Sequence, residues 1–149
     1  MTLLQRIRLL VAALWVGSLW TVGYVVAPTL FATLADRALA GTIAGSLFRV
    51  EAWLSLACGL LLLALIWGVQ DKPASERRNA LRLVGGMMLC TAVGYFGLQP
   101  FMAAIRETAA LTGGMSADSR LNFGILHGVA SGIFLIQSLL GAALILKLR

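Results

Sequence analysis

Polar side chains recur at helical spacing within three otherwise apolar stretches of the sequence. On an α-helix, steps of three and four residues return to the same face. The residues spaced in this way are Glu51, Ser55 and Cys58 in one stretch, Tyr95 and Gln99 in the next, and His127, Ser131 and Ser138 in the last. Polar groups at membrane depth usually face the interior of a helical bundle and pair with one another. The spacing therefore predicts one polar pocket shared by three helices.

Two kinds of binding chemistry fit these residue types. A neutral imidazole beside a thiol suits a soft or borderline cation, so His127 and Cys58 are the predicted metal ligands. Phenol, amide, hydroxyl and charged groups suit a polar ligand instead. The predicted ligand-binding residues are Arg49, Glu51, Ser55, Tyr95, Gln99 and His127.

Each of these residues also has a structural interpretation. His127 could hydrogen-bond a neighbouring helix, and Gln99 could bond a carbonyl group that Pro100 leaves without its usual donor. Arg49 and Glu51 could form an ion pair at the membrane interface. The sequence leaves open whether the polar group is a ligand site or a hydrogen-bonded knot that holds the helices in register.

The elements that must position these residues are membrane helices. Hydrophobic residues form 60% of the chain and charged residues 12%, whereas a soluble domain has about 25% charged residues. A helical span needs roughly 20 largely apolar residues. Four such runs predict spans at about residues 9–28, 50–70, 83–105 and 121–146, in a single domain that covers residues 1–149. The predicted fold is an all-α, polytopic membrane four-helix bundle.

Charge predicts the orientation of this bundle. With four spans, both termini and the loop at residues 71–82 lie on one side, which carries eight basic and two acidic residues, a net charge of +6. The other side carries four of each and is neutral. The positive-inside rule places the basic side in the cytoplasm, so we expect N-in/C-in topology in a bacterial inner membrane. The basic loop is interpreted as a topology signal in contact with anionic lipid rather than as a nucleic-acid site.

A further, external helical segment is expected to lead into the second span. Asp36 is a suitable N-cap for a helix that begins at Arg37 and continues through Glu51. Small residues four positions apart let membrane helices approach closely. The candidates for such packing are Gly41 and Gly45 in this segment, and Gly124, Gly128 and Gly132 in the last span. We expect at least one of these faces to lie at a chain–chain contact in a homo-oligomer.

Several chemistries lack their usual motifs. A single histidine and the absence of Cys-x-x-Cys argue against a structural zinc site within one chain. The sequence also has no GxSxG motif, no P-loop and no acidic pair at mid-membrane depth, which favours a non-enzymatic role. It shows no repeat that indicates inverted topology, and it identifies no cofactor.

The chain resembles the bacterial branch of the transmembrane protein 205-like family in three segments, WVGSLWTVGYVVAPTLFATL, AGTIAGSLFRVEAW and NFGILHGVAS. The residues that carry the resemblance are Trp15, Gly17, Pro28, Leu30, Phe31, Gly41, Phe48, Trp53, His127 and Gly128. That family has four predicted membrane helices and a domain of unknown function. The W-x-G…P-x-L-F pattern is more distantly similar to copper-resistance protein D-type membrane proteins and to the four-helix haem-dependent protoporphyrinogen oxidase.

These resemblances imply a membrane protein linked to metal handling. The oxidase family relies on histidines early in the chain, and the first span here has none, which argues against haem. The sequence therefore predicts a non-enzymatic membrane module that binds or passes a small ligand or soft metal ion, or that supports a membrane-protein partner. The alternative is a haem- or quinone-linked membrane oxidoreductase.

Overall fold

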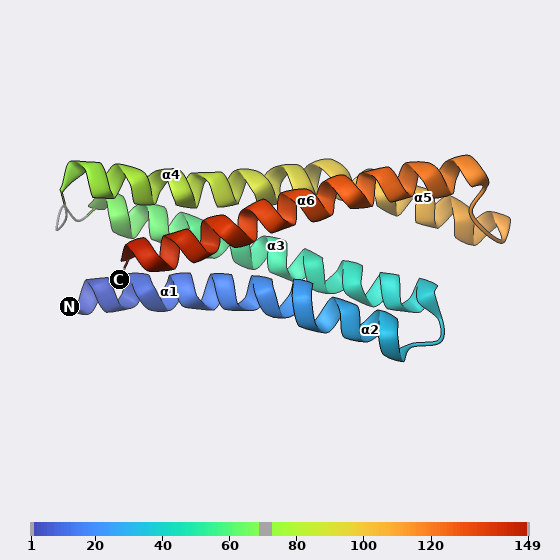
Figure 1. The fold of residues 1–149 in the computed structure, drawn as a ribbon, viewed down its shortest axis with the longest axis horizontal. Coiled ribbons are helices and arrows are strands. Elements are labelled where there is room, and N and C mark those ends of the chain that lie inside the picture. The colour runs from blue at the N-terminus through green and yellow to red at the C-terminus, as the bar shows by residue number, and fades with distance from the viewer. Residues whose placement is uncertain (1, 69–72, 149) are drawn as a thin grey trace.

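The structure, a computed structural model, describes residues 2–68 and 73–148, which form helices joined by short connections (Figure 1). The first half of the chain comprises α1 (Leu3–Trp20), η1 (Thr21–Val26), α2 (Ala27–Thr33) and α3 (Arg37–Gly68). The second half comprises α4 (Ala74–Thr91), η2 (Ala92–Leu98), α5 (Gln99–Thr112) and α6 (Ala117–Leu148). The elements η1 and η2 are π-helical turns that continue one α-helix into the next.

Four continuous helical segments are long and apolar enough to cross a membrane. They cover Leu3–Thr33, Arg37–Gly68, Ala74–Thr112 and Ala117–Leu148. Each is longer than the roughly 20 residues that a span requires, and each exposes large apolar side chains, which hydrocarbon solvates as well as a protein core does. The all-α class and the four membrane-compatible helices are thus confirmed, while membrane insertion and its orientation remain predictions.

The first helical segment does not end near Pro28, as the sequence suggested, but continues to Thr33. Proline lacks an N–H group, and its ring clashes with the carbonyl group four residues earlier in a regular α-helix. In both halves of the chain a wider π-helical turn comes just before the proline: η1 precedes Pro28 and η2 precedes Pro100. Such turns are a known way to accommodate a break in the α-helical hydrogen-bond ladder.

The helix that begins at Arg37 forms as predicted. The Oδ1 atom of Asp36 accepts hydrogen bonds from the backbone N–H groups of Ala38, at 2.8 Å, and Leu39, at 3.1 Å. The expected external segment and the second span are one continuous helix, α3. Residues 74–82 of the expected basic loop form the first turns of α4 after Pro73. Residues 71–72 of that loop and residues 69–70, the expected end of the second span, lie outside the described residues.

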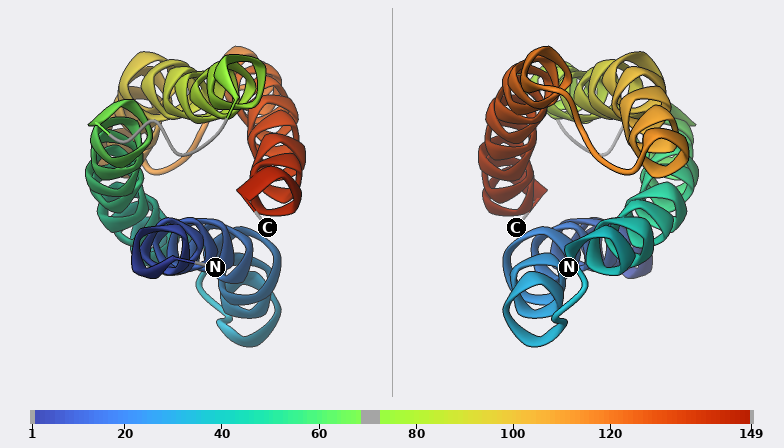
Figure 2. Two further views of the ribbon diagram at one scale, coloured as in Figure 1. Left: turned by 90° about the vertical axis from the view of Figure 1, so that its left-hand side faces the viewer. Right: turned by 90° about the vertical axis from the view of Figure 1, so that its right-hand side faces the viewer.

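The four segments form a ring in which each packs against two neighbours, in the order α1, α3, α4, α6 (Figure 2). Both ends of the chain lie at one end of the bundle, which we call the proximal end (Figure 1). The opposite end, which we call the distal end, contains α2, α5 and the first turns of α3 and α6. The hydrophobic core surrounds Trp15, Leu62, Met87 and Leu144, all with 0% exposure, and it extends toward the proximal end.

The two halves of the chain share one plan. Each has a helix with a π-helical turn that contains Val-Gly-Tyr, then a proline, and then a helix of 32 residues. The buried residues Arg8, Ala12, Trp15 and Leu19 of α1 recur 72 positions later as Ala80, Val84, Met87 and Thr91 of α4. Likewise, Ser55, Gly59, Leu62 and Ile66 of α3 recur 82 positions later as Gln137, Gly141, Leu144 and Leu148 of α6. The bundle is therefore a parallel repeat of two helical hairpins.

A buried hydrogen bond between side chains joins the two long helices at the same level of each hairpin. In the first hairpin, Trp15 Nε1 donates to Ser55 Oγ at 2.8 Å. In the second hairpin, Gln137 Nε2 donates to Thr91 Oγ1 at 2.9 Å. Ser55 and Gln137 occupy equivalent positions in the repeat, so the same point of each hairpin is joined by different side chains.

Glycines allow close contact between the two hairpins. A Cβ atom built at Gly59 of α3 would lie 2.7 Å from Met88 Cγ of α4, and one built at Gly141 of α6 would lie 2.9 Å from Val16 Cγ2 of α1. Gly59 and Gly141 are equivalent in the repeat, and so are Val16 and Met88. The two interfaces between the hairpins are therefore built in the same way, with a glycine opposite a larger side chain.

Candidate functional site

One ionisable side chain is buried in the middle of a membrane-compatible helix. Glu51 is the 15th of the 32 residues of α3, about 21 Å from its first residue at 1.5 Å per residue. Its side chain is 5% exposed. An interfacial ion pair with Arg49 does not form, because Arg49 is exposed and its Nε donates to the Tyr95 hydroxyl at 3.3 Å. Ionisable residues at such depth are rare and mark functional sites more often than other polar residues do.

Glu51 accepts hydrogen bonds from two hydroxyl groups. Ser18 Oγ of α1 lies 3.2 Å from Glu51 Oε1, and Ser55 Oγ of α3 lies 3.4 Å from the same oxygen. Ser55 Oγ in turn accepts the hydrogen bond from Trp15 Nε1, and Ser18 Oγ lies 2.9 Å from the Trp15 carbonyl oxygen. Trp15, Ser18, Glu51 and Ser55 form a connected set between α1 and α3, which we call the Glu51 group. Its carboxyl is held by neutral donors.

A second polar set lies nearer the distal end. Arg49, Tyr95, Gln99 and Arg106 come from α3, η2 and α5, and we call them the distal cluster. Arg106 Nη1 donates to the Gly41 carbonyl oxygen of α3 at 3.3 Å. The Arg106 guanidinium also lies 5.9 Å from the centre of the Phe123 ring of α6, within the range of a cation–π contact. Arg106 therefore connects three helical segments.

The small residues at the start of α3 make room for this cluster. A Cβ atom built at Gly45 would lie 3.7 Å from both Arg106 Nη2 and Gln99 Nε2, and one built at Gly41 would lie 3.8 Å from Arg106 Nη1. Gly41 and Gly45 were predicted to pack against another helix. In this chain they instead lie beside two long polar side chains of α5.

The structure divides the predicted pocket between two places. Glu51 and Ser55 belong to the Glu51 group, whereas Arg49, Tyr95 and Gln99 belong to the distal cluster. His127 belongs to neither, because it is exposed on α6 and stacks on Phe123, with ring centres 6.1 Å apart and ring planes at 6°. Helical spacing identified residues that share a face, but the faces of three helices do not meet at one level.

His127 and Cys58 do not lie together. Cys58 is buried in the core beside Gly59. His127 comes 14 residues before Gly141, the counterpart of Gly59 in the repeat, and so lies about 21 Å away along the bundle. The second span was predicted to begin at about residue 50, whereas α3 begins 13 residues earlier. Among residues 2–68 and 73–148, no group of three or more His, Cys, Asp or Glu side chains is placed to hold a metal ion.

The glycine ridge of the last span faces outward. Cβ atoms built at Gly124, Gly128 and Gly132 would meet nothing within 4 Å, and all three residues are exposed on α6. The ridge takes no part in packing within the described chain. It is available to lipid or to another protein.

Sequence reasoning missed Trp15, Ser18, Arg106 and Phe123. Trp15 and Ser18 are three residues apart, which is the same helical signal that was used for the other helices, but they were not included in the pocket. Arg106 was counted as a charge of the external loop. The predicted span ended at residue 105, one residue before Arg106, whereas α5 continues to Thr112.

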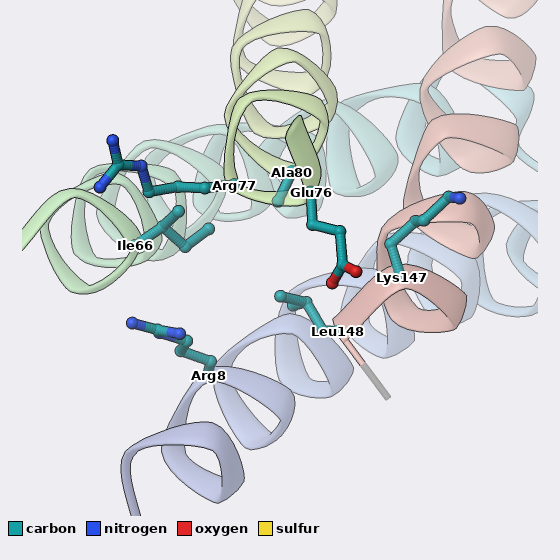
Figure 3. Close-up of a pocket in the computed structure, with 7 residues that line it drawn as sticks. All are labelled: Arg8, Ile66, Glu76, Arg77, Ala80, Lys147 and Leu148. Atoms are coloured by element: carbon teal, nitrogen blue, oxygen red, sulfur yellow. The ribbon is translucent and has the colours of Figure 1, made fainter. Parts of the chain in front are cut away.

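Charged side chains close the proximal end of the bundle. A cavity of about 10 Å³ lies among Arg8, Ile66, Glu76, Arg77, Ala80, Lys147 and Leu148 (Figure 3). That volume suits at most one water molecule. Arg8 is 3% exposed, and its Nη2 donates to the Leu65 carbonyl oxygen at 2.7 Å. The two candidate sites lie away from this end.

Comparison with protein families identifies one match. Residues 10–110 match the family described as Domain of unknown function (DUF4149). The chain belongs to this family. The matched DUF4149 segment contains the whole Glu51 group and the whole distal cluster, and it ends before α6. No curated protein and no solved structure matches the chain. Membership of the transmembrane protein 205-like family and similarity to copper-resistance proteins remain predictions.

Proposed function

We propose that this DUF4149 protein is a non-enzymatic, multi-pass membrane module that binds the phosphate group of a small ligand or lipid at the distal cluster. The observation that carries the proposal is the position of Arg106. Its guanidinium reaches from α5 to a carbonyl oxygen of α3 and to an aromatic ring of α6, and neither partner carries a negative charge. A phosphate would supply that charge.

The neighbouring residues suit the same ligand. A guanidinium presents several N–H donors in a planar fork, which matches the oxygen atoms of phosphate. The Gln99 amide lies beside Arg106 along the glycine face of α3. Arg49 adds a second guanidinium, which the Tyr95 hydroxyl orients. The cluster thus offers two cations and an amide, and its acceptors are neutral.

We place the protein in a bacterial inner membrane with N-in/C-in topology. The net charge of +6 at the proximal end, against zero at the distal end, supports this orientation. The distal cluster then lies in the outer half of the bilayer, where headgroup phosphates or soluble phosphate can approach it. We favour this ligand over the soft metal ion, because His127 and Cys58 are far apart.

We also propose that the protein forms a homo-oligomer through the ridge of Gly124, Gly128 and Gly132. Small residues at four-residue steps let two membrane helices approach closely. The ridge is exposed and makes no contact within its own chain, which leaves it open to a second copy.

The test of phosphate binding compares two arginine variants of the full-length protein in a neutral detergent. Phosphatidylglycerol is titrated and followed by native mass spectrometry, and inorganic phosphate is titrated separately by calorimetry. We expect Arg106→Gln to weaken binding of one of the two probes at least tenfold, about 1.4 kcal/mol, since a hydrogen bond to a charged group contributes about 1.5–3 kcal/mol. Arg120→Gln, an exposed arginine at the start of α6, should leave binding unchanged.

The two probes distinguish the possible sources of phosphate. Loss of phosphatidylglycerol binding alone assigns the site to a lipid headgroup, and loss of inorganic phosphate binding assigns it to a soluble anion. If the wild-type protein binds neither probe, or if both variants lose binding equally, the proposal is wrong.

A further inference from the structure

We propose that the carboxyl group of Glu51 is a mid-membrane binding site for one small monovalent cation, H⁺ or Na⁺. The inference concerns the Glu51 group alone and does not rest on phosphate binding at the distal cluster. Glu51 is 5% exposed, and the hydroxyl oxygens of Ser18 and Ser55 lie 3.2 and 3.4 Å from its Oε1 atom.

The first argument is the cost of burying a charge. A carboxylate moved into a low-dielectric interior is strongly unfavourable unless a positive charge or a proton neutralises it. The hydrogen-bond donors that reach Glu51 are the hydroxyls of Ser18 and Ser55, which are neutral. Arg49, the nearest cation along α3, is turned toward Tyr95. One negative charge with neutral donors therefore requires one monovalent cation from outside the chain.

The second argument comes from the internal repeat. By the shift of 72 positions in α1 and of 82 positions in α3, Ser18 corresponds to Cys90 and Glu51 corresponds to Ile133. The second hairpin thus has the same scaffold with a thiol and an aliphatic side chain at these two positions. Packing two long helices of this fold does not require a buried acid, so the fold alone does not account for Glu51.

The third argument is the type of atom around the carboxyl. The two hydroxyl oxygens and the carboxylate are hard ligands, which suit a cation such as Na⁺. The same hydroxyls can also hydrogen-bond a protonated carboxyl. H⁺ and Na⁺ would each bring one positive charge to the same carboxyl, so binding of one excludes binding of the other.

Other titratable and charged groups lie around α3. Arg49 and Cys58 are on α3 itself, Tyr95 is on the packed η2, and Tyr24 is on the packed η1. Tyr95 accepts a hydrogen bond from Arg49, and Tyr24 donates one to Ser138 Oγ at 2.9 Å. Arg8 of the packed α1 donates to the Leu65 carbonyl oxygen, and Glu76 of the packed α4 is exposed. Glu51 is the only buried carboxyl among the described residues, so a carboxyl signal from the bundle interior can be assigned to it.

The experiment is infrared difference spectroscopy of the purified full-length protein in lipid, which separates the carboxylic acid band from carboxylate bands. In one arm the pH is raised stepwise in potassium buffer, and in the other Na⁺ replaces K⁺ at constant pH. We expect reversible loss of a buried carboxylic acid band in at least one arm. The band should be missing in Glu51→Gln and present in the control Glu107→Gln, which removes an exposed acid.

The arms separate the two cations. Loss of the band on addition of Na⁺ at constant pH identifies a Na⁺ site, and loss with rising pH that Na⁺ does not affect identifies a proton site. A Glu51 band that stays constant in both arms, or a wild-type spectrum without such a band, overturns the proposal. If Glu51→Gln does not fold, the double variant Ser18→Cys/Glu51→Ile replaces it, because that pair already occurs at the equivalent positions of the second hairpin.

Discussion

Substitution of Gly141 by alanine tests whether close contact between the two hairpins limits the stability of the bundle. A Cβ atom at this position would lie 2.9 and 3.1 Å from the two Cγ atoms of Val16 and 3.3 Å from Met87 Cε. Valine is β-branched and has few alternative rotamers, and Val16 is fully buried. The neighbour therefore cannot move aside without shifting α1.

The expected change in the free energy of unfolding is the difference between two opposing contributions, helix propensity and overpacking. Alanine is more favourable than glycine in a helix interior by about 1 kcal/mol. Overpacking a close-packed site costs about 1–3 kcal/mol. Gly141→Ala should therefore lower the free energy of unfolding by up to about 2 kcal/mol. Gly128→Ala on the same helix meets open space and should leave stability unchanged or raise it by up to about 1 kcal/mol.

The assay is reversible denaturation in mixed micelles, followed by tryptophan fluorescence. It compares the single variants Gly141→Ala, Val16→Ala and Gly128→Ala with the double variant Val16→Ala/Gly141→Ala. In the double variant the methyl groups that clash are absent, so the combined loss should be smaller than the sum of the single losses. If Gly141→Ala is as stable as Gly128→Ala, or if the two substitutions are additive, the close contact described here does not limit stability.

Three further predictions follow from other features. Ser55→Ala leaves the buried Trp15 N–H without its acceptor and should lower the free energy of unfolding by about 1–3 kcal/mol in the same assay. The control Ser46→Ala, at an exposed serine, should change it by less than about 0.5 kcal/mol. Equal effects of the two substitutions would contradict a stabilising role for the Trp15–Ser55 hydrogen bond. Single cysteines at positions 75 and 115 of a cysteine-free variant should react with a membrane-impermeant reagent from opposite sides of the membrane, and reaction from one side would refute the topology. If the ridge joins two copies, Gly128→Leu should reduce the size of the detergent-solubilised particle measured by size-exclusion chromatography. Gly17→Leu, at another glycine whose Cβ would meet open space, should leave that size unchanged. Identical monomeric elution of the wild type and both variants would exclude this interface.

The helices themselves were predictable because they depend on local features. The four long apolar runs, the scarcity of charge between them and the N-cap at Asp36 all act within a few residues of where they occur. Pro28 misled the prediction of helix length, since proline usually ends a helix or kinks it, whereas the span predicted at residues 83–105 already ran past Pro100. What overrides that tendency is the π-helical turn before each proline, and no residue type specifies such a turn by itself.

The candidate site was predictable only in part, because it depends on the position of each helix along the bundle axis relative to its neighbours. Helical spacing grouped Glu51 with Ser55, whose hydroxyl lies 3.4 Å from Glu51 Oε1. It could not relate one helix to the next, since an error in one starting residue moves every later side chain by 1.5 Å along the axis. His127 was assigned to the interior because it is polar, whereas it is exposed on α6 and stacks on Phe123. The internal repeat was overlooked because few residues are identical between the halves and the correspondence lies mainly in which positions are buried.

The hairpin repeat also has a consequence for the order of assembly. The two buried side-chain hydrogen bonds, Trp15–Ser55 and Thr91–Gln137, each join helices of the same hairpin. The tight glycine contacts, Gly59 with Met88 and Gly141 with Val16, each join helices of different hairpins. The Trp15–Ser55 bond can therefore form before the second hairpin is present. The steric fit must wait until the second hairpin arrives, as must the bonds between hairpins, Arg49–Tyr95, Arg106–Gly41 and Tyr24–Ser138. A ribosome that pauses between the hairpins would leave the first one internally bonded, with Gly59 still open to lipid.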